Sequence, residues 1–478
     1  MPTADKKVIN GWAMYDWANS VYNLVITTTF FPVLYNTIVS SAPYNGKIHF
    51  LGREFAAVPF KDYCMALSFL LVVIMIPVLS SIADTRGNKK KFMFFFCTLG
   101  SICCSLLYFF DTSNVILAVF LFCVATIGFY GSQVFYNSYL PEIADVKDQD
   151  RISAKGYMYG YIGSVILQII GFGLVLYFGD AEKLKPLQIT FLLVGIWWFG
   201  FAQISFRRLP PSPPAIASKG NPFKDGFKEL KKVVTLLRSL PVLKRYLVSF
   251  FLYSTGVQTI MLVATDWGLT ELRLEQSILI ITVVIIQLVG ILGAVLVSKL
   301  SGRIGNLRTL MATVVLWIVV CIGGYFLGRK SFVLEPYAKR IESFETQKRT
   351  IPSTDTLAIK SVETQIADVK KEMKPVQAPI QNGFFALAIA VGLVMGGIQA
   401  LSRATYSKLM PTNTKDTASF FSFYDVTEKL SIVTGVFSFG FIHERTGSMS
   451  NSVLALMGFF ILGLLWLYFT YKRKTELV

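Results

Sequence analysis

The chain has 478 residues, of which 53% are hydrophobic and only 16% are charged, and its mean hydropathy is +0.55. A soluble globular chain carries about 25% charged residues, so this composition excludes an ordinary soluble domain. The net charge of +17 does not indicate nucleic-acid binding, because the basic residues gather in loops between apolar blocks without any nucleic-acid motif. Two histidines, and six cysteines without metal-ligand spacing, predict neither a metal site nor another cofactor.

The apolar residues form blocks of about 20 residues, which is the length of a helix that crosses a bilayer core of about 30 Å. Lys and Arg concentrate after the second, sixth and twelfth blocks, so the positive-inside rule predicts two cytoplasmic termini. We therefore expect an all-α polytopic protein in the lipid bilayer of a bacterial-type inner membrane. The twelve predicted transmembrane helices cover residues 12–39, 63–82, 91–110, 115–138, 157–179, 187–206, 246–266, 276–298, 309–327, 383–402, 417–441 and 451–471.

The first predicted helix carries polar residues on one face. Asn19 and Asn23 follow Asp16 at i+3 and i+7, and Asp16 would lie about 6 Å inside the helix, near the cytoplasmic interface. Charged groups in a bilayer are costly and need a reason. The stripe indicates either a polar cavity or a network that fixes this helix against its neighbours, and both interpretations stay open.

Two polar connections separate the helices. Residues 207–245 form a basic linker, in which apolar residues at 4,3,4,3 spacing predict an amphipathic helix on the cytoplasmic membrane surface, or else a solvated linker helix. Residues 328–382 carry two further amphipathic patterns, which predict a helical hairpin outside the membrane. The linker divides the chain into an N-terminal half, residues 1–206, and a C-terminal half, residues 246–478, with the hairpin as an insertion.

The eleventh predicted helix carries a charged cluster about 12 Å from its cytoplasmic end. Asp425 and Lys429 stand at i,i+4 with the acid first, so they are expected to pair and to leave Glu428 as a candidate proton carrier. Arg403, at the cytoplasmic end of the tenth helix, is a competing partner for these acids or a ligand for a substrate carboxylate. A purely structural brace between helices ten and eleven would explain the same residues.

Uncharged polar residues also occur inside the predicted helices. They are candidates to line a cavity, although a single such residue more often hydrogen-bonds a neighbouring helix. The residues are Gln133, Asn137, Gln168, Gln258, Gln287 and Gln399.

The chain contains an internal repeat. Asn88 after the second predicted helix recurs as Asn306 after the eighth, at an offset of 218 residues, and Gln133 recurs as Gln399, at an offset of 266. The insertion 328–382 accounts for the difference between the offsets. Two repeated six-helix units with a basic linker resemble the organisation of major facilitator transporters, which implies twelve helices in two pseudo-symmetric halves.

The segment after the second predicted helix resembles the signature of the same superfamily. Asp84, Gly87 and Lys89 match that signature, whereas three other positions depart from it. The resemblance implies a cytoplasmic latch in which Asp84 faces the N-terminus of a neighbouring helix, with Arg86 beside it and Arg303 in the repeat. The alternative is that the basic residues only anchor the helix end in the interface.

Three stretches resemble one family more closely. The first runs from Trp12 to Ser20 and contains Tyr15-Asp16-Trp17-Ala18-Asn19. The second joins the fourth and fifth helices and covers 136–144 and 151–161. The third comprises the run from Gly397 to Arg403 at the end of the tenth helix and Phe420-Phe421 followed by Tyr424 in the eleventh. Together they look like the vacuole effluxer family of fungal vacuolar amino-acid effluxers and their bacterial relatives. The resemblance implies export of small solutes, with amino acids as the best guess. Asp425 departs from the asparagine expected after Tyr424.

These observations predict a secondary transporter, monomeric and not an enzyme, that works by alternating access on a small solute with protons as a candidate coupling ion. No glycine-rich nucleotide loop indicates direct use of ATP. One alternative is a non-transporting sensor or assembly partner that uses the outer hairpin. The other is a membrane-embedded lipid enzyme, which the shortage of histidine and the lack of a nucleophile–base pair disfavour.

Overall fold

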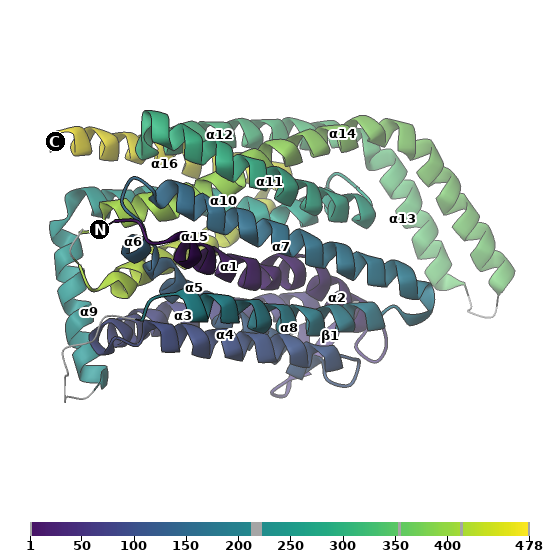
Figure 1. The fold of residues 1–478 in the computed structure, drawn as a ribbon. Coiled ribbons are helices and arrows are strands. Elements are labelled where there is room, and N and C mark those ends of the chain that lie inside the picture. The colour runs from purple at the N-terminus through teal and green to yellow at the C-terminus, as the bar shows by residue number, and fades with distance from the viewer. Residues whose placement is uncertain (1, 212–221, 352–354, 412–413, 477–478) are drawn as a thin grey trace.

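The computed structural model describes residues 2–211, 222–351, 355–411 and 414–476. Long helices run alongside one another, and both termini lie at the same end of the bundle, which we call the terminal end (Figure 1). A helical hairpin projects from the opposite, outer end (Figure 1). Nearly every described residue outside short connections is helical, as the all-α prediction requires.

The N-terminal half contains six crossings. The first is a continuous helix in three parts, and short elements join several of the others. The elements are α1 (Lys6–Val21), η1 (Tyr22–Phe30), α2 (Phe31–Ser40), β1 (Lys47–Phe50), β2 (Arg53–Ala56), α3 (Ala57–Arg86), α4 (Lys89–Leu106), η2 (Leu107–Phe109), α5 (Val115–Ser138), α6 (Leu140–Ile143), α7 (Gln149–Phe178), η3 (Gly179–Glu182) and α8 (Lys185–Arg208). The two strands pair antiparallel at the outer end.

The C-terminal half contains six further crossings, and a linker helix precedes it. The elements are the linker helix α9 (Pro222–Ser239), then α10 (Pro241–Thr270), α11 (Gln276–Ile304), α12 (Asn306–Ser331), η4 (Phe332–Leu334), α13 (Glu335–Thr350), α14 (Thr356–Leu409), α15 (Thr417–Thr446) and α16 (Met449–Thr475). Within the described residues, ten helices are long and apolar enough to span a membrane. The two remaining crossings are the first helix and α15, which carry the polar stripe and the charged cluster.

The first crossing changes its winding in the middle. Residues Tyr22–Phe30 form a π-helix, a form that occurs mostly as single turns and frequently at functional sites. The wider turn leaves the Leu24 carbonyl to accept hydrogen bonds from Gln168 Nε2 at 2.8 Å and Thr28 Oγ1 at 2.8 Å. Gln168 in turn accepts from Gln287 Nε2 at 3.0 Å. Gln168 and Gln287 therefore join α7 of one half to α11 of the other.

The halves pack against each other along few helices. Within each half the helices interlock through buried aromatic side chains, of which Trp12, Trp198 and Trp317 are completely buried. Between the halves, α3 and α5 contact α15, while α7 contacts α11 and α14. Large apolar side chains such as Leu176, Phe326 and Phe437 stay exposed on the outside of the bundle, where lipid replaces water.

The predicted outer hairpin is not separate from the crossings. α13 matches its first half, but its second half continues into the tenth crossing as one helix of 54 residues, through Pro375 and Pro379. The hairpin was expected to end at residue 382, before the tenth predicted crossing at 383–402. Met373 and Ile380 pack in a cluster with Trp267, and this packing holds the helix together on both sides of the prolines.

The linker helix α9 lies across the terminal end of the bundle (Figure 1). Its apolar face, expected to rest on the membrane, packs on the ends of α3, α10 and α15 instead. Val233 is completely buried, and Gly226 allows the backbone to approach Ile82. The apolar side chains at the ends of α3, α10 and α15 thus form the surface on which the apolar side of α9 packs. Part of the linker, residues 212–221, lies outside the described residues.

Candidate functional site

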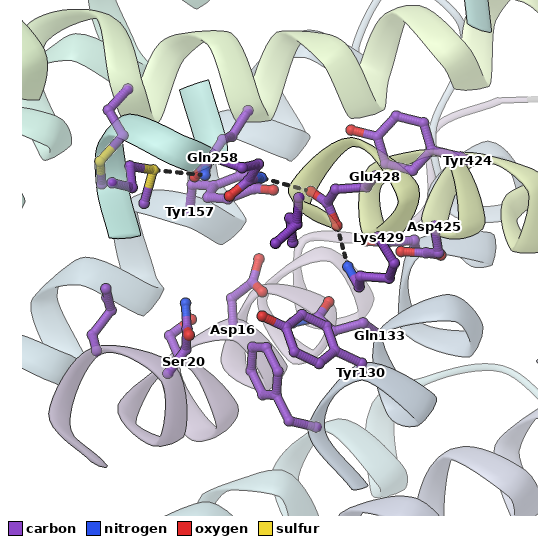
Figure 2. Close-up of a pocket in the computed structure, with 18 of the residues that line it drawn as sticks. Asp16, Ser20, Tyr130, Gln133, Tyr157, Gln258, Tyr424, Asp425, Glu428 and Lys429 are labelled. Atoms are coloured by element: carbon purple, nitrogen blue, oxygen red, sulfur yellow. Dashed lines mark hydrogen bonds and ion pairs between the residues drawn. The ribbon is translucent and has the colours of Figure 1, made fainter. Parts of the chain in front are cut away.

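A cavity of about 110 Å³ lies between the two halves. Helices α1, α5 and α7 line it from one half, and α10, α14 and α15 from the other (Figure 2). Eleven residues were predicted to lie on a pathway for a substrate or proton, and the cavity brings together all but two of them. Those that line it are Asp16, Asn23, Gln133, Asn137, Gln399, Tyr424, Asp425, Glu428 and Lys429.

Asn19 and Arg403 are the predicted residues that do not line this cavity. Asn19 is completely buried, and neither atom of its amide group has a hydrogen-bond partner among the described residues. Arg403 is 1% exposed and lies between the cavity and the terminal end, six residues before α14 ends at Leu409. We therefore distinguish the cavity from a buried cluster around Arg403.

Arg403 joins the two halves through an unusually complete set of contacts. Its Nε donates to Ser153 Oγ at 2.9 Å, one terminal nitrogen donates to the Ser153 carbonyl at 2.9 Å, and the other donates to Asn137 Oδ1 at 3.1 Å. The guanidinium also forms an ion pair with Asp16 at 3.4 Å. The expected pairing of Arg403 with Glu428 or Asp425 is wrong, because donors and acceptors of the N-terminal half already surround the guanidinium.

Aromatic rings complete the surroundings of this buried ion pair. The Arg403 guanidinium lies 4.5 Å from the ring centre of Tyr157 and 4.8 Å from that of Trp12. Such cation–π contacts strengthen when they are shielded from water. The Tyr136 hydroxyl donates to Asp16 Oδ2 at 2.7 Å. Together these contacts compensate the desolvation of both charges.

A glycine makes room for the cluster. A Cβ atom at Gly156 would lie 2.5 Å from Asp16 Oδ2 and 2.8 Å from the Tyr136 hydroxyl. No side chain can therefore replace the hydrogen atom of Gly156 without displacing the ion pair. Ser153, Tyr136 and Gly156 were not among the predicted site residues.

Asp16 lies deeper than predicted. α1 begins at Lys6, six residues before the predicted start, because polar residues extend the helix beyond the apolar block. Asp16 is thus about 15 Å along the helix, at a depth similar to that of Asp425 in α15. The Asp16 carboxylate lines the cavity.

The charged cluster on α15 pairs differently from the prediction. Lys429 forms its ion pair with Glu428, which also accepts from Gln258 Nε2 at 3.1 Å (Figure 2). The Lys429 ammonium lies 4.1 Å from the ring centre of Tyr130 on α5. The i,i+4 rule describes side chains along a free helix surface, whereas here the ring on the facing helix draws the lysine away from Asp425. Glu428 is not the carboxylate left over.

Asp425 is the carboxylate left without a cation. It is 4% exposed and lines the cavity, and its Oδ2 has no hydrogen-bond partner among the described residues. Residues of both halves surround the cavity that this carboxylate borders, as Figure 2 shows. Buried polar atoms are nearly always hydrogen-bonded, so an unpartnered one that borders a cavity requires an explanation.

The latch residues meet α15 at the terminal end. Asp84 Oδ2 accepts from the backbone nitrogen of Ser419 at 2.7 Å and from its hydroxyl at 2.8 Å, so the carboxylate lies at the N-terminus of α15. Gly87 ends α3 in the left-handed conformation, with φ of 64°. Arg86 forms an ion pair of 3.8 Å with Asp225 of the linker helix.

Lys89 ties the same junction together more tightly. It is 2% exposed, forms an ion pair with Glu142, and donates to Thr417 Oγ1 at 2.8 Å. Thr417 also donates to Glu142 at 2.7 Å. Since Thr417 opens α15, this triad joins α4 and α6 of the first half to the second half.

A second junction of the same kind exists, but not through Arg303, which is exposed. Asp150, at the start of α7, accepts from Ser301 Oγ at 2.8 Å and Asn306 Nδ2 at 2.7 Å, and forms an ion pair of 2.7 Å with Lys408. Three inter-half contact regions thus lie between the cavity and the terminal end. They are the two junctions and the Arg403 cluster.

Two six-helix halves around a shared polar cavity define the class of protein: a membrane transporter of the major facilitator fold. The proton:xylose symporter XylE, solved with 6-bromo-6-deoxy-D-glucose, aligns with a TM-score of 0.63 at 14% identity, over 97% of this chain and 94% of XylE. A bacterial homologue of the iron transporter ferroportin in an outward-facing state aligns at 0.62 and 11% identity, over 98% and 99%. These likenesses concern the fold.

Sequence comparison identifies the family. A family model described as "Vacuole effluxer Atg22 like" matches residues 4–344 and 375–476, and the chain belongs to this family. It is 27% identical to an uncharacterized MFS-type transporter, YxiO of Bacillus subtilis, over 96% of this chain and 94% of YxiO. Autophagy-related protein 22-1 of Penicillium rubens is 24% identical, over 95% and 88%. The chain is therefore a membrane transporter and not an enzyme.

Proposed function

We propose that this protein is a secondary transporter that exports or exchanges amino acids, with protons as the coupling ion, through the cavity between its halves. The observation that carries the proposal is a polar cavity of about 110 Å³ lined by both halves and separated from the terminal end by inter-half ion pairs. Rocking the halves would break these pairs and expose the cavity to the other side. Amino acids come from the family resemblance.

The predicted pathway residues receive roles in this proposal. The lining residues of the cavity contact the solute, and the Arg403–Asp16 pair acts as the inner gate. The residues around Asp84 and Asp150 hold the gate shut at the helix ends. Because one chain supplies both halves of the cavity, we propose a monomer, placed in a bacterial-type inner membrane with both termini in the cytoplasm.

Transport in proteoliposomes tests the function. Counterflow and pH-driven uptake would be measured with each labelled amino acid, for wild type and for Arg403→Ala, with Asp62→Asn on the outer part of α3 as a matched control. We expect movement by wild type and the control, driven by the pH gradient, and at least a tenfold loss in Arg403→Ala. Failure of wild type to move any amino acid contradicts the substrate. Transport that ignores the gradient contradicts proton coupling.

The orientation requires a separate test. Single cysteines introduced at Lys474 and Ser361 would be labelled in right-side-out membrane vesicles with an impermeant maleimide. The proposal expects labelling at position 361 of the outer hairpin without permeabilisation and at position 474 only after it. The reverse pattern would place the termini outside.

A further inference from the structure

We propose that Asp425 is the binding site for one positive charge in the transport cavity, delivered by a solute ammonium group or by a coupling proton. This inference rests on the proposed function, since it concerns the same cavity. It goes beyond that function because it assigns the charge selectivity of the cavity to one carboxylate, that of Asp425. Asp425 is the buried charge beside the cavity that no ion pair with an oppositely charged described residue compensates.

The charged residues around the cavity divide into pairs and a remainder. Asp16 pairs with Arg403, and Glu428 pairs with Lys429. Asp425 is left, with an Oδ2 atom that no described residue hydrogen-bonds. The five groups together carry a formal charge of one negative unit, and that unit lies on Asp425. A buried unpaired carboxylate is unfavourable, so this site favours the entry of a cation.

The two basic side chains are not free to bind an anion instead. Lys429 has Glu428 on one side and the Tyr130 ring on the other. Arg403 uses its nitrogens on Ser153, Asn137 and Asp16, and it does not line the cavity. A solute carboxylate would therefore meet only neutral donors, such as the amides of Gln133, Gln258 and Gln399. This arrangement admits an ammonium ion or a zwitterion and disfavours an anion.

No other group on the packed helices offers a second unpaired charge near Asp425. The remaining titratable side chains that face this region are tyrosines, which are uncharged at neutral pH, apart from Asp16 and Arg403 already paired. Among the described residues they are Tyr130 and Tyr136 on α5, Tyr157 and Tyr161 on α7, Tyr246 and Tyr253 on α10, Tyr406 on α14 and Tyr424 on α15. Asp84 of α3 and the α9 side chains Glu229 and Lys232 reach only the start of α15, and no described charged residue of α16 lines the cavity.

The test uses purified full-length protein and two probes. Thermal unfolding would be followed with methylammonium chloride against tetrapropylammonium chloride, whose charge is too shielded to reach a buried carboxylate. Infrared pH titration would follow the C=O band of a protonated carboxylic acid. The variants are Asp425→Asn, which is isosteric and removes the charge, Asp425→Glu, which restores it, and Glu428→Gln, which removes the paired acid.

Each source of charge gives its own result. If an ammonium binds, methylammonium stabilises wild type by mass action, and Asp425→Asn weakens this binding at least tenfold while Asp425→Glu recovers part of it. If a proton binds, Asp425→Asn loses the infrared band and methylammonium has no effect. Signals that survive in Asp425→Asn, or vanish only in Glu428→Gln, overturn the assignment. Neither readout needs transport, so a transport failure in wild type would refute the proposed function separately.

Discussion

The two inter-half junctions at the terminal end occupy equivalent places in the repeat but are built differently. In the first, Asp84 is partly exposed and caps α15, beside the ion pair of Lys89 with Glu142. In the second, Asp150 is 6% exposed and binds Lys408 directly. The offset of 266 residues relates Glu142 to Lys408, Ser153 to Ser419 and Asp150 to Asp416.

The comparison shows which property the repeat has kept. Glu142 and Lys408 carry opposite charges at equivalent places, and Asp84 is replaced by Gly302 in the repeat. Each junction nevertheless holds one carboxylate of the N-terminal half with donors of the C-terminal half. Both repeats thus have a contact across the interface at this place, but different residues make it. Asp150 of the second junction is more deeply buried than Asp84 of the first, so the removal of these two carboxylates should differ in energy.

The largest expected effect concerns Asp150. Asp150→Ala would leave the Lys408 ammonium, which is 17% exposed, without its anionic partner and would remove one of the two acceptors of Ser301 and of Asn306. Breaking a largely buried pair on one side costs about 3 kcal/mol. We expect this loss of unfolding free energy in denaturant titrations in detergent. A loss below that of Asp84→Ala would show that burial does not distinguish the junctions.

The ion pair of Lys89 with Glu142 should come next. A double-mutant cycle with Lys89→Met and Glu142→Gln is expected to give a coupling energy of about 2 kcal/mol, because Lys89 is almost completely buried. The charge-exchanged variant, with Lys89→Glu and Glu142→Lys, should recover part of the stability of the single variants. Additive effects of the two substitutions would mean that the pair contributes no stability of its own.

Asp84→Ala should have a smaller effect. It removes an acceptor at a helix N-terminus, and such caps contribute about 1 kcal/mol. Stability alone would not reveal the functional consequence. We expect faster maleimide labelling, from the terminal end, of a cysteine at the cavity-lining position Gln133, because the contacts between α3 and α15 would open more often. Unchanged labelling would indicate that Asp84 caps α15 without holding the halves closed.

The smallest effect is a pH dependence at Asp416, the repeat equivalent of Asp150. Burial raises the pKa of Asp416, Glu229 raises it further, and Lys232 opposes the shift. A raised native pKa means that the folded protein binds the proton more tightly than the unfolded chain. The stability that Asp416 contributes is therefore present below its unfolded pKa of about 3.9 and is lost as pH rises through the native pKa.

Asp416→Asn should remove this dependence, and the change should stay below about 1 kcal/mol at a partly exposed site. Asp148 is the control of opposite sign, since hydrogen bonds from Thr3 and Arg151 lower its pKa. Its contribution is present above the unfolded pKa and is lost as pH falls through the lowered native value. Unfolding midpoints measured across acidic pH should show opposite trends in Asp416→Asn and Asp148→Asn.

The sequence predicted the fold well because the bilayer restricts the choices. An apolar block of about 20 residues has few structures available other than a crossing helix, so each predicted helix was found with shifted ends. Helix continuity was harder to predict. The predicted hairpin ended at residue 382, whereas α14 continues through Pro375 and Pro379 into the tenth crossing, where Met373 and Ile380 pack on both sides of the prolines.

The cavity was predicted in composition but not in its pairing. Polar residues inside apolar helices are conspicuous, and most of the predicted ones line the cavity. Which acid pairs with which base depends on facing helices. Tyr130 draws Lys429 towards Glu428, and Ser153 with Asn137 draws Arg403 towards Asp16. Tyrosine and serine are common in helix cores, so nothing in the local sequence indicated these roles.

The length of α14 has a mechanical consequence. Its 54 residues have a contour length of about 80 Å, and the helix changes direction where the hairpin leaves the bundle (Figure 1). Arg403 lies near one end of this helix and Val362 of the hairpin near the other. A movement of the Arg403 end is therefore expected to reach the hairpin through one continuous backbone. A label on the hairpin would report such a movement from outside the bundle.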